Sequence, residues 1–155
     1  MTKRVFCLLM LGALAFGAEK YDGPKPKKSD VPYLLHASKL EETEGLEAKK
    51  ESQKNADTYV VAGPASTAKT PLAEPIFIMQ AERISPERME LYRFDVKNGR
   101  REVTLSKRKG GKVLRLTVRR LEGRLWRIEA AEPLENGEYA LTPDGSDIVF
   151  CFSIY

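Results

Sequence analysis

Basic side chains are concentrated in one part of the chain, where they could bind a polyanion. Residues 76–121 contain thirteen Lys and Arg and five Asp and Glu, whereas residues 122–155 contain two and seven. A dense positive surface attracts polysaccharide, lipid head groups or acidic proteins. The candidate polyanion-binding residues are Lys97, Arg100, Arg101, Lys107, Arg108, Lys109, Lys112, Arg115 and Arg119. The alternative is a solvated sheet face, where these side chains form cross-strand ion pairs with Glu102, Glu129 and Glu132.

Side chains that could catalyse a reaction are few. His36 is the only histidine, and no serine lies in the glycine pattern of a nucleophile elbow. Glu41 and Glu44 belong to a charged run, which is typical of a solvated surface. Cys151 lies in an apolar run without a basic neighbour, which predicts a small buried side chain rather than a nucleophile. We expect no enzymatic activity, no cofactor and no metal; a hydrolase with a deep pocket around His36 or paired carboxylates is the less favoured alternative.

The first 18 residues predict a secretory signal peptide. Lys3 and Arg4 precede an apolar run at residues 5–16, and small residues then allow cleavage before Ala18 or one residue later. The run is shorter than the roughly 20 apolar residues of a membrane-spanning helix, so we expect no membrane span after cleavage. An exported protein acts in the periplasm or outside the cell. A nucleic-acid partner is therefore not expected, and the basic residues lack the interleaved aromatics of single-strand binders.

The rest of the chain divides into a charged arm and a domain with a regular apolar pattern. Residues 19–57 contain few large apolar side chains and read as an extended or marginally helical arm. Within it, residues 31–35 are apolar and predict a short strand that could dock on the main domain. Residues 40–54 are highly charged and predict an exposed helix or a mobile hairpin. Residues 58–155 are long enough to fold without disulfides or metals.

The composition is globular, with 42% apolar and 31% charged residues, and short apolar runs recur between turn signals in residues 58–155. This spacing is typical of an all-β fold. The runs are residues 58–62, 76–81, 90–96, 101–105, 113–121, 124–130, 138–141 and 148–154. We predict an antiparallel β-sandwich of immunoglobulin-like or transthyretin-like class, with eight strands in two sheets. A single closed sheet is the alternative.

Turn residues predict how three pairs of strands align. Asn98–Gly99 is a strong two-residue hairpin signal, and this turn sets Phe94 opposite Val103 on one face. A hairpin at residues 142–146 pairs residues 139–141 with the last strand. That strand has apolar residues on both faces, so we expect it to be central or covered on both sides, with residues 31–35 as a candidate cover.

The third hairpin offers two possible loops. A two-residue turn at Glu122–Gly123 would place apolar and charged side chains on the same face. A three-residue loop at residues 121–123 sets Val118 opposite Trp126 and gives one coherent apolar face, with the glycine in the left-handed conformation. The sequence therefore favours the three-residue loop.

These features together predict an exported, non-enzymatic binding or structural module that acts through protein–protein contacts. Its partner would be a protein that contacts a sheet edge or the arm. The alternative is a polyanion binder that uses the basic hairpins of residues 97–120 to hold an anionic surface polymer or lipid head group.

Overall fold

The computed structural model describes residues 20–155, which fold into β-strands and one short 3₁₀ turn, η1 (Pro86–Arg88). The predicted signal peptide at residues 1–18 lies outside the described residues. All eight apolar runs predicted as strands contain strands, so the all-β prediction is confirmed for the described part of the chain.

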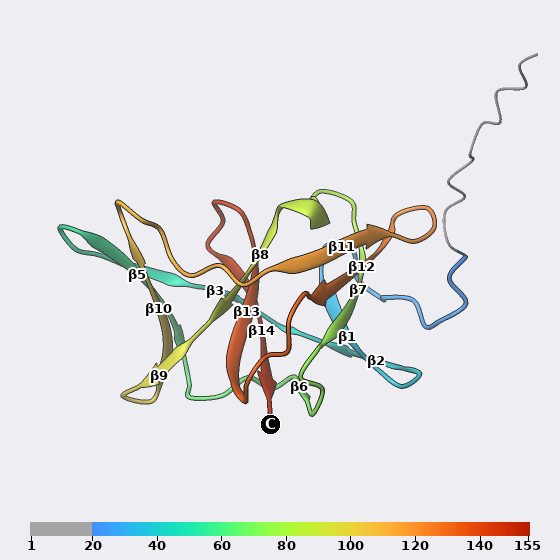
Figure 1. Ribbon diagram of the computed structural model, residues 1–155, viewed down its shortest axis with the longest axis horizontal. Helices are drawn as coiled ribbons and strands as arrows, with labels where there is room; N and C mark the ends of the chain where they lie inside the picture. Colours follow the sequence, from blue (N-terminus) through green and yellow to red (C-terminus); the bar gives the residue numbers. More distant parts are fainter. Residues whose placement is uncertain (1–19) are drawn as a thin grey trace, which may run out of the picture.

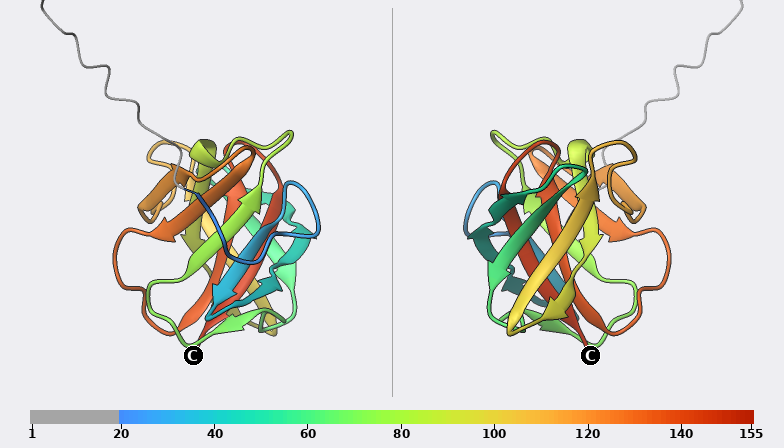
Figure 2. Two further views of the ribbon diagram at one scale, coloured as in Figure 1. Left: turned by 90° about the vertical axis from the view of Figure 1, so that its right-hand side faces the viewer. Right: turned by 90° about the vertical axis from the view of Figure 1, so that its left-hand side faces the viewer.

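The strands form three sheets that lie as layers, with sheet B between sheets A and C (Figure 1). Sheet A contains, in spatial order, β11 (Leu116–Arg120), β12 (Leu125–Ala130), β7 (Ile76–Gln80), β1 (Pro32–His36) and β2 (Lys39–Glu42). Sheet B contains β3 (Glu44–Glu47), β14 (Ile148–Ile154), β13 (Gly137–Pro143) and β8 (Met89–Arg93), with β6 (Lys69–Thr70) beside β14. Sheet C, which faces the viewer in the right-hand view of Figure 2, contains β4 (Lys49–Ser52), β5 (Ala56–Ala62), β10 (Arg100–Ser106) and β9 (Asp95–Lys97). The described strand pairs are antiparallel except β6 with β14.

Large apolar side chains fill the space between sheets A and B. Phe77 of β7 meets Phe152 of β14 edge to face, with ring centroids 4.9 Å apart. Leu34, Ile128 and Leu141 are buried in the same cluster. Removal of this apolar surface from water is the main source of stability for the two layers.

A second apolar cluster lies between sheets B and C. The side chains of Val149 and Cys151 point to the face of β14 opposite Phe152, because neighbouring residues of a strand point to opposite faces. They pack with Val61 and Phe94. The sandwich-like architecture therefore has three sheets where the sequence predicted two. The expected burial of Cys151 is confirmed.

The apolar segment at residues 31–35 does not cover the second face of β14, so that prediction is wrong. Sheet C covers it instead, and β1 lies inside sheet A, where Tyr33 pairs with Ile78 and Glu42. The expected short strand is confirmed, but it extends a sheet rather than lying across one.

Residues 39–52 run along the edges of all three sheets in turn. β2, β3 and β4 follow one another with a single residue between them, and those two residues, Thr43 and Ala48, are buried at the bends. Residues 40–54 therefore contain extended strands and do not form the exposed helix that was one of the two predictions for them. Their charged side chains suit edge strands, whose outer faces and free edges meet solvent.

The Asn98–Gly99 turn forms as predicted. Both residues have positive φ angles, 51° and 70°, which this hairpin type requires. Val96 pairs with Arg101 in the predicted register, but the ladder ends at Asp95 with Glu102, so the predicted pairing of Phe94 with Val103 does not form. Phe94 lies where the chain passes from β8 of sheet B to β9 of sheet C, and its N–H donates to the Glu138 carbonyl at 2.9 Å.

The β11–β12 hairpin has the predicted loop length, but its predicted register is wrong by two residues. Val118 pairs with Ile128 rather than Trp126, and the loop is Glu122–Arg124. Leu121 stays in the ladder because it is buried against the outer face of sheet A. A shift of two residues leaves every side chain on its predicted face, and the loop glycine has the expected left-handed φ of 55°.

Candidate functional site

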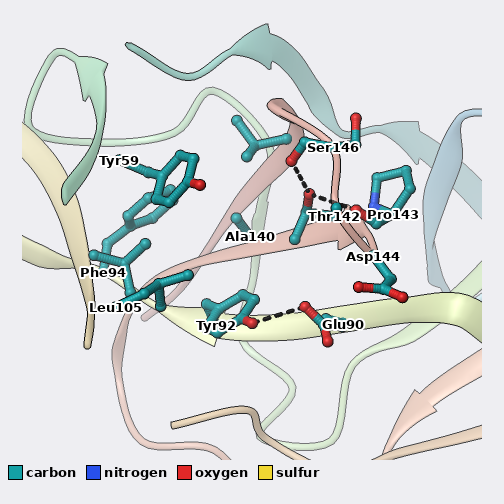
Figure 3. A pocket seen from close by; sticks show the side chains of 13 residues that line it. Tyr59, Glu90, Tyr92, Phe94, Leu105, Ala140, Thr142, Pro143, Asp144 and Ser146 are labelled. Carbon is teal, nitrogen blue, oxygen red and sulfur yellow. Dashed lines mark hydrogen bonds between the residues drawn. The ribbon is translucent and has the colours of Figure 1, made fainter. Parts of the chain in front are cut away.

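Sheets B and C leave a pocket of about 290 Å³ that opens beside the loop joining β13 to β14 (Figure 3). Its lining residues come from both sheets and from that loop. They are Tyr59, Glu90, Tyr92, Phe94, Val103, Leu105, Ala140, Thr142, Pro143, Asp144, Gly145, Ser146 and Val149. The pocket therefore combines three aromatic rings with two carboxylates.

Strand alternation places the aromatic wall. Glu90, Tyr92 and Phe94 are alternate residues at and beyond β8, so all three point to the same side of the strand, toward sheet C. Tyr59 of β5 and Leu105 of β10 lie on the same side of the pocket as Phe94, and Glu90 and Asp144 lie on the other (Figure 3). Tyr59 is half-buried, whereas Tyr92 and Phe94 are only 8% and 4% exposed.

The Tyr92 hydroxyl donates to Glu90 Oε2 at 2.7 Å, and the two side chains form one polar unit at the pocket wall. Burial of the ring raises the pKa of Tyr92 well above its ordinary value, and the hydrogen bond and charge of Glu90 raise it further. Tyr92 therefore remains a protonated donor. Among the described residues, no lysine or arginine forms an ion pair with Glu90.

The loop at the pocket mouth is held by η1 and by its own hydrogen bonds. Asp144 accepts from Arg88 Nη2 at 2.9 Å, and its N–H donates to the Arg88 carbonyl at 2.9 Å. The Thr142 hydroxyl donates to the Ile148 carbonyl at 2.8 Å. The Ser146 hydroxyl accepts from the Ile148 N–H at 3.1 Å. The mouth is therefore formed in advance of any ligand.

The segment at residues 107–112 packs against the pocket wall from outside. The backbone of Gly111 lies close to Leu105 and Tyr92. A Cβ atom at this position would overlap Leu105 Cδ2 and would lie 3.2 Å from Tyr92 Cε1. Only glycine lets the backbone approach these two side chains so closely. The size of the pocket thus depends on a glycine that does not line it.

The nine predicted polyanion-binding residues lie in three separate places. Lys97 and Arg100 flank the β9–β10 turn, and residues 107–109 follow the opposite end of β10, roughly 20 Å away for a seven-residue strand. Arg115 and Arg119 lie at β11 in sheet A (Figure 1). The sequence pattern does not reveal this separation, because β10 carries its basic residues at its two ends.

Several of these basic side chains are already paired with carboxylates. Lys97 lies 3.6 Å from Glu102, and Arg100 lies 3.0 Å from Glu51. The same arrangement holds for Lys107 with Asp57 and for Arg115 with Glu132. Cross-strand pairing was the predicted alternative to a polyanion site. Arg108, Lys109 and Lys112 lie in the exposed connection after β10.

Arg101 is a correction to the predicted set, because it is only 1% exposed and cannot contact a polymer at the surface. Its Nη1 donates to Ser66 Oγ at 2.7 Å, and its Nη2 contacts Glu44 Oε1 at 3.1 Å. Ser66 in turn donates to Glu138 at 2.6 Å, and Ser153 donates to the same carboxylate. Arg101 alternates with Val103 and Leu105 along β10, and that pattern already marks an inward-facing position.

The residues considered for catalysis do not meet. His36 is exposed at the end of β1 in sheet A, whereas the pocket lies between sheets B and C. Glu44 on β3 forms an ion pair with Arg101, whereas Glu41 lies on β2 of another sheet. Sequence reasoning missed Glu90 and Asp144, although the alternation of Glu90 with Tyr92 offered a signal. No group of three metal-binding side chains occurs within residues 20–155.

Comparisons of the chain with protein-family models, curated proteins and solved structures find no match. Within residues 20–155, no helix has the length and apolar character needed to cross a membrane. The pocket geometry and the distribution of charge are therefore the features from which a function can be inferred.

Proposed function

We propose that the protein is an exported, non-enzymatic binding module that contacts a partner protein through the pocket between sheets B and C. The observation that carries this proposal is a preformed pocket of about 290 Å³ whose lining places Tyr59, Tyr92 and Phe94 beside two carboxylates. Aromatic side chains in a preformed hollow provide most of the energy in many protein interfaces. The mouth is fixed by hydrogen bonds, so little conformational freedom is lost on binding.

Binding is favoured over catalysis because each reactive group of the pocket is already engaged. Tyr92 is bound to Glu90, and Asp144 is bound to Arg88. The hydroxyls of Thr142 and Ser146 interact with backbone groups. A nucleophile needs a base within hydrogen-bond reach, and Tyr92 with Glu90 is such a pair in the pocket lining. Burial of the ring and the charge of Glu90 raise the pKa of Tyr92, however, and this keeps its hydroxyl in the unreactive protonated form.

A protein partner is favoured over an anionic polymer by the charges at this site. The pocket carries carboxylates, which repel a polyanion. The basic residues outside it are divided among three places, and several are neutralised by ion pairs. Exposed ion pairs of this kind are weak but still reduce the positive field that would hold a polymer.

The finer fold class belongs to the same proposal. We assign sheets A and B to the sandwich itself, of immunoglobulin-like or transthyretin-like class, and sheet C to an additional layer. The larger of the two main apolar clusters lies between sheets A and B, which supports this division. The additional layer creates the pocket.

Site-specific photo-cross-linking tests the proposal. A benzoylphenylalanine at Ser146 samples the pocket mouth, and the same residue at His36 is the matched control on sheet A. In cells that export the protein, we expect one protein to be cross-linked from position 146 and not from position 36. Equal products from both positions, or none from position 146, would contradict the proposal.

A further inference from the structure

We propose that the pocket accepts a lysine or arginine side chain of the partner protein. This inference rests on the proposed function and adds the chemistry of the group that enters. The lining contains Glu90 and Asp144 but no lysine, arginine or histidine, in a chain that has 26 Lys and Arg. The charge of the site is therefore opposite to that of the surrounding segment, residues 76–121.

Glu90 is the charge that an incoming cation would neutralise. Asp144 already pairs with Arg88, whereas Glu90 has only the neutral Tyr92 hydroxyl as a hydrogen-bond partner among the described residues. Burial raises the pKa of the Tyr92 hydroxyl, and the carboxylates of Glu90 and Asp144 raise it further. A cation that enters would gain a charge-assisted hydrogen bond.

The apolar and polar parts of the pocket lie on different sides of it. Phe94, Ala140 and Val149 are buried, whereas Asp144 is exposed in the loop that joins β13 to β14. Figure 3 shows Glu90 and Asp144 on one side and Tyr59, Phe94 and Leu105 on the other. A side chain with an alkyl stem and a charged head matches this arrangement, because the stem contacts the apolar side while the head meets Glu90 on the other side.

The aromatic rings favour a cation for an independent reason. The face of an aromatic ring attracts cations through its quadrupole. The chain itself shows this at Tyr59, where Lys50 Nζ lies 5.8 Å from the ring centroid. A guanidinium or ammonium between Tyr59 and Tyr92 would add ring contacts to the bond with Glu90.

The volume limits the ligand to a single side chain. Pockets for drug-sized ligands span roughly 300–1,000 Å³, and this pocket is at the lower end with about 290 Å³. A lysine or arginine side chain therefore fills the space, and the rest of the partner would rest on the rim at residues 143–146.

Nuclear magnetic resonance titration with four capped amino acids tests the inference. The cationic probes are N-acetyl-arginine and N-acetyl-lysine methylamides, and their neutral counterparts contain citrulline and N6-acetyl-lysine. We expect the cationic probes to shift amide signals of β5, β8 and residues 142–146, with binding about tenfold or more tighter than that of the neutral probes. Equal shifts from arginine and citrulline, or shifts only outside the pocket, would overturn the inference.

Two variants and a control assign the effect to the pocket. Glu90→Gln keeps the shape and should weaken arginine binding about tenfold, whereas Glu87→Gln on η1 should leave it unchanged. Tyr59→Leu, which leaves Glu90 intact, should also weaken the cationic probes. If position 146 is cross-linked to a partner but neither cationic probe binds, the proposed function stands and the proposed ligand is wrong.

Discussion

The guanidinium of Arg101 and the carboxylate of Glu44 form an ion pair of 3.1 Å in the interior of the protein, where Arg101 is 1% exposed. The pair joins β10 of sheet C to β3 of sheet B. Arg101 also donates to the carbonyls of Ala62 and Gly63 at 2.8 and 3.1 Å. A buried charge is tolerated when it is paired and hydrogen-bonded in this way. This network positions the two sheets between which the pocket lies.

Replacement of Arg101 tests that structural role. Arg101→Ala leaves the Glu44 and Glu138 carboxylates without their cation, so we expect the free energy of unfolding to fall by about 3–5 kcal/mol. The neighbouring Arg100→Ala removes exposed ion pairs and should cost no more than about 1 kcal/mol. Urea unfolding of both variants measures the difference. Equal losses would show that Arg101 is no more important than a surface arginine.

Gly111→Ala tests the dependence of the pocket on the close approach of the backbone. The added methyl group overlaps Leu105, whose flexible end must move toward the pocket. We expect cross-linking to the partner from Ser146 to fall, with a stability loss of about 1–3 kcal/mol. Gly45→Ala is the control, because its methyl group would meet Phe150 at an ordinary 3.7 Å. Unchanged cross-linking in Gly111→Ala would contradict this account of the wall.

Burial raises the pKa of the Cys151 thiol to about 12; Arg101 opposes this effect, and Glu44 and Glu138 add to it. The folded protein therefore favours the neutral thiol, and this contribution to stability is complete below pH 9. It decreases by about 1.4 kcal/mol per pH unit as the pH rises toward 12. Cys151→Ala should lack this slope in urea unfolding. A thiol reagent at pH 8 should label the unfolded protein and spare the native one; rapid native labelling would contradict the burial of Cys151.

Asp30 accepts hydrogen bonds from the N–H groups of Glu82, Arg83 and Ile84 at 2.8, 2.9 and 3.1 Å. Burial opposes ionisation, but these three donors and the Arg83 charge together lower the pKa of Asp30 below its ordinary value. Its stabilisation is present near pH 7 and is lost as the pH falls through the folded pKa. Asp30→Ala should cost about 1 kcal/mol or more at pH 7, and the difference from the native protein should shrink below pH 4. A pH-independent difference would show that the carboxylate charge has no role.

The proposed export is tested by the N-terminus of the protein that cells produce. The sequence predicts cleavage before Ala18 or one residue later. Intact-mass measurement of the exported protein should therefore give a chain that starts at residue 18 or 19. Ala15→Leu disrupts the small-residue pattern and should leave the precursor uncleaved. An exported protein that retains residues 1–17 would contradict the signal-peptide prediction.

Alternation of apolar residues was enough to predict the longer strands of residues 58–155, because two-residue periodicity marks a buried face, but it did not reveal the two-residue strand β6. It failed at residues 39–52, whose edge strands bury too few side chains to leave a pattern. The β11–β12 register was wrong by two because both registers bury the same face, and only the packing of Leu121 on sheet A distinguishes them.

The candidate site was not predictable in the same way. Basic residues close in sequence lie at opposite ends of β10, and Arg101 is inside the protein. Glu90 and Asp144, 54 positions apart in the chain, line the same pocket only because β13 pairs with β8. Such long-range relationships depend on sheet order, which local patterns do not encode.

The most direct test is a hydrogen-exchange footprint of the protein with and without the partner identified by cross-linking. The account predicts slower exchange in β5, β8 and residues 142–146, which surround the pocket. Slower exchange confined to the basic turns at residues 97–100 and 107–112 would contradict it and support a surface that binds anions.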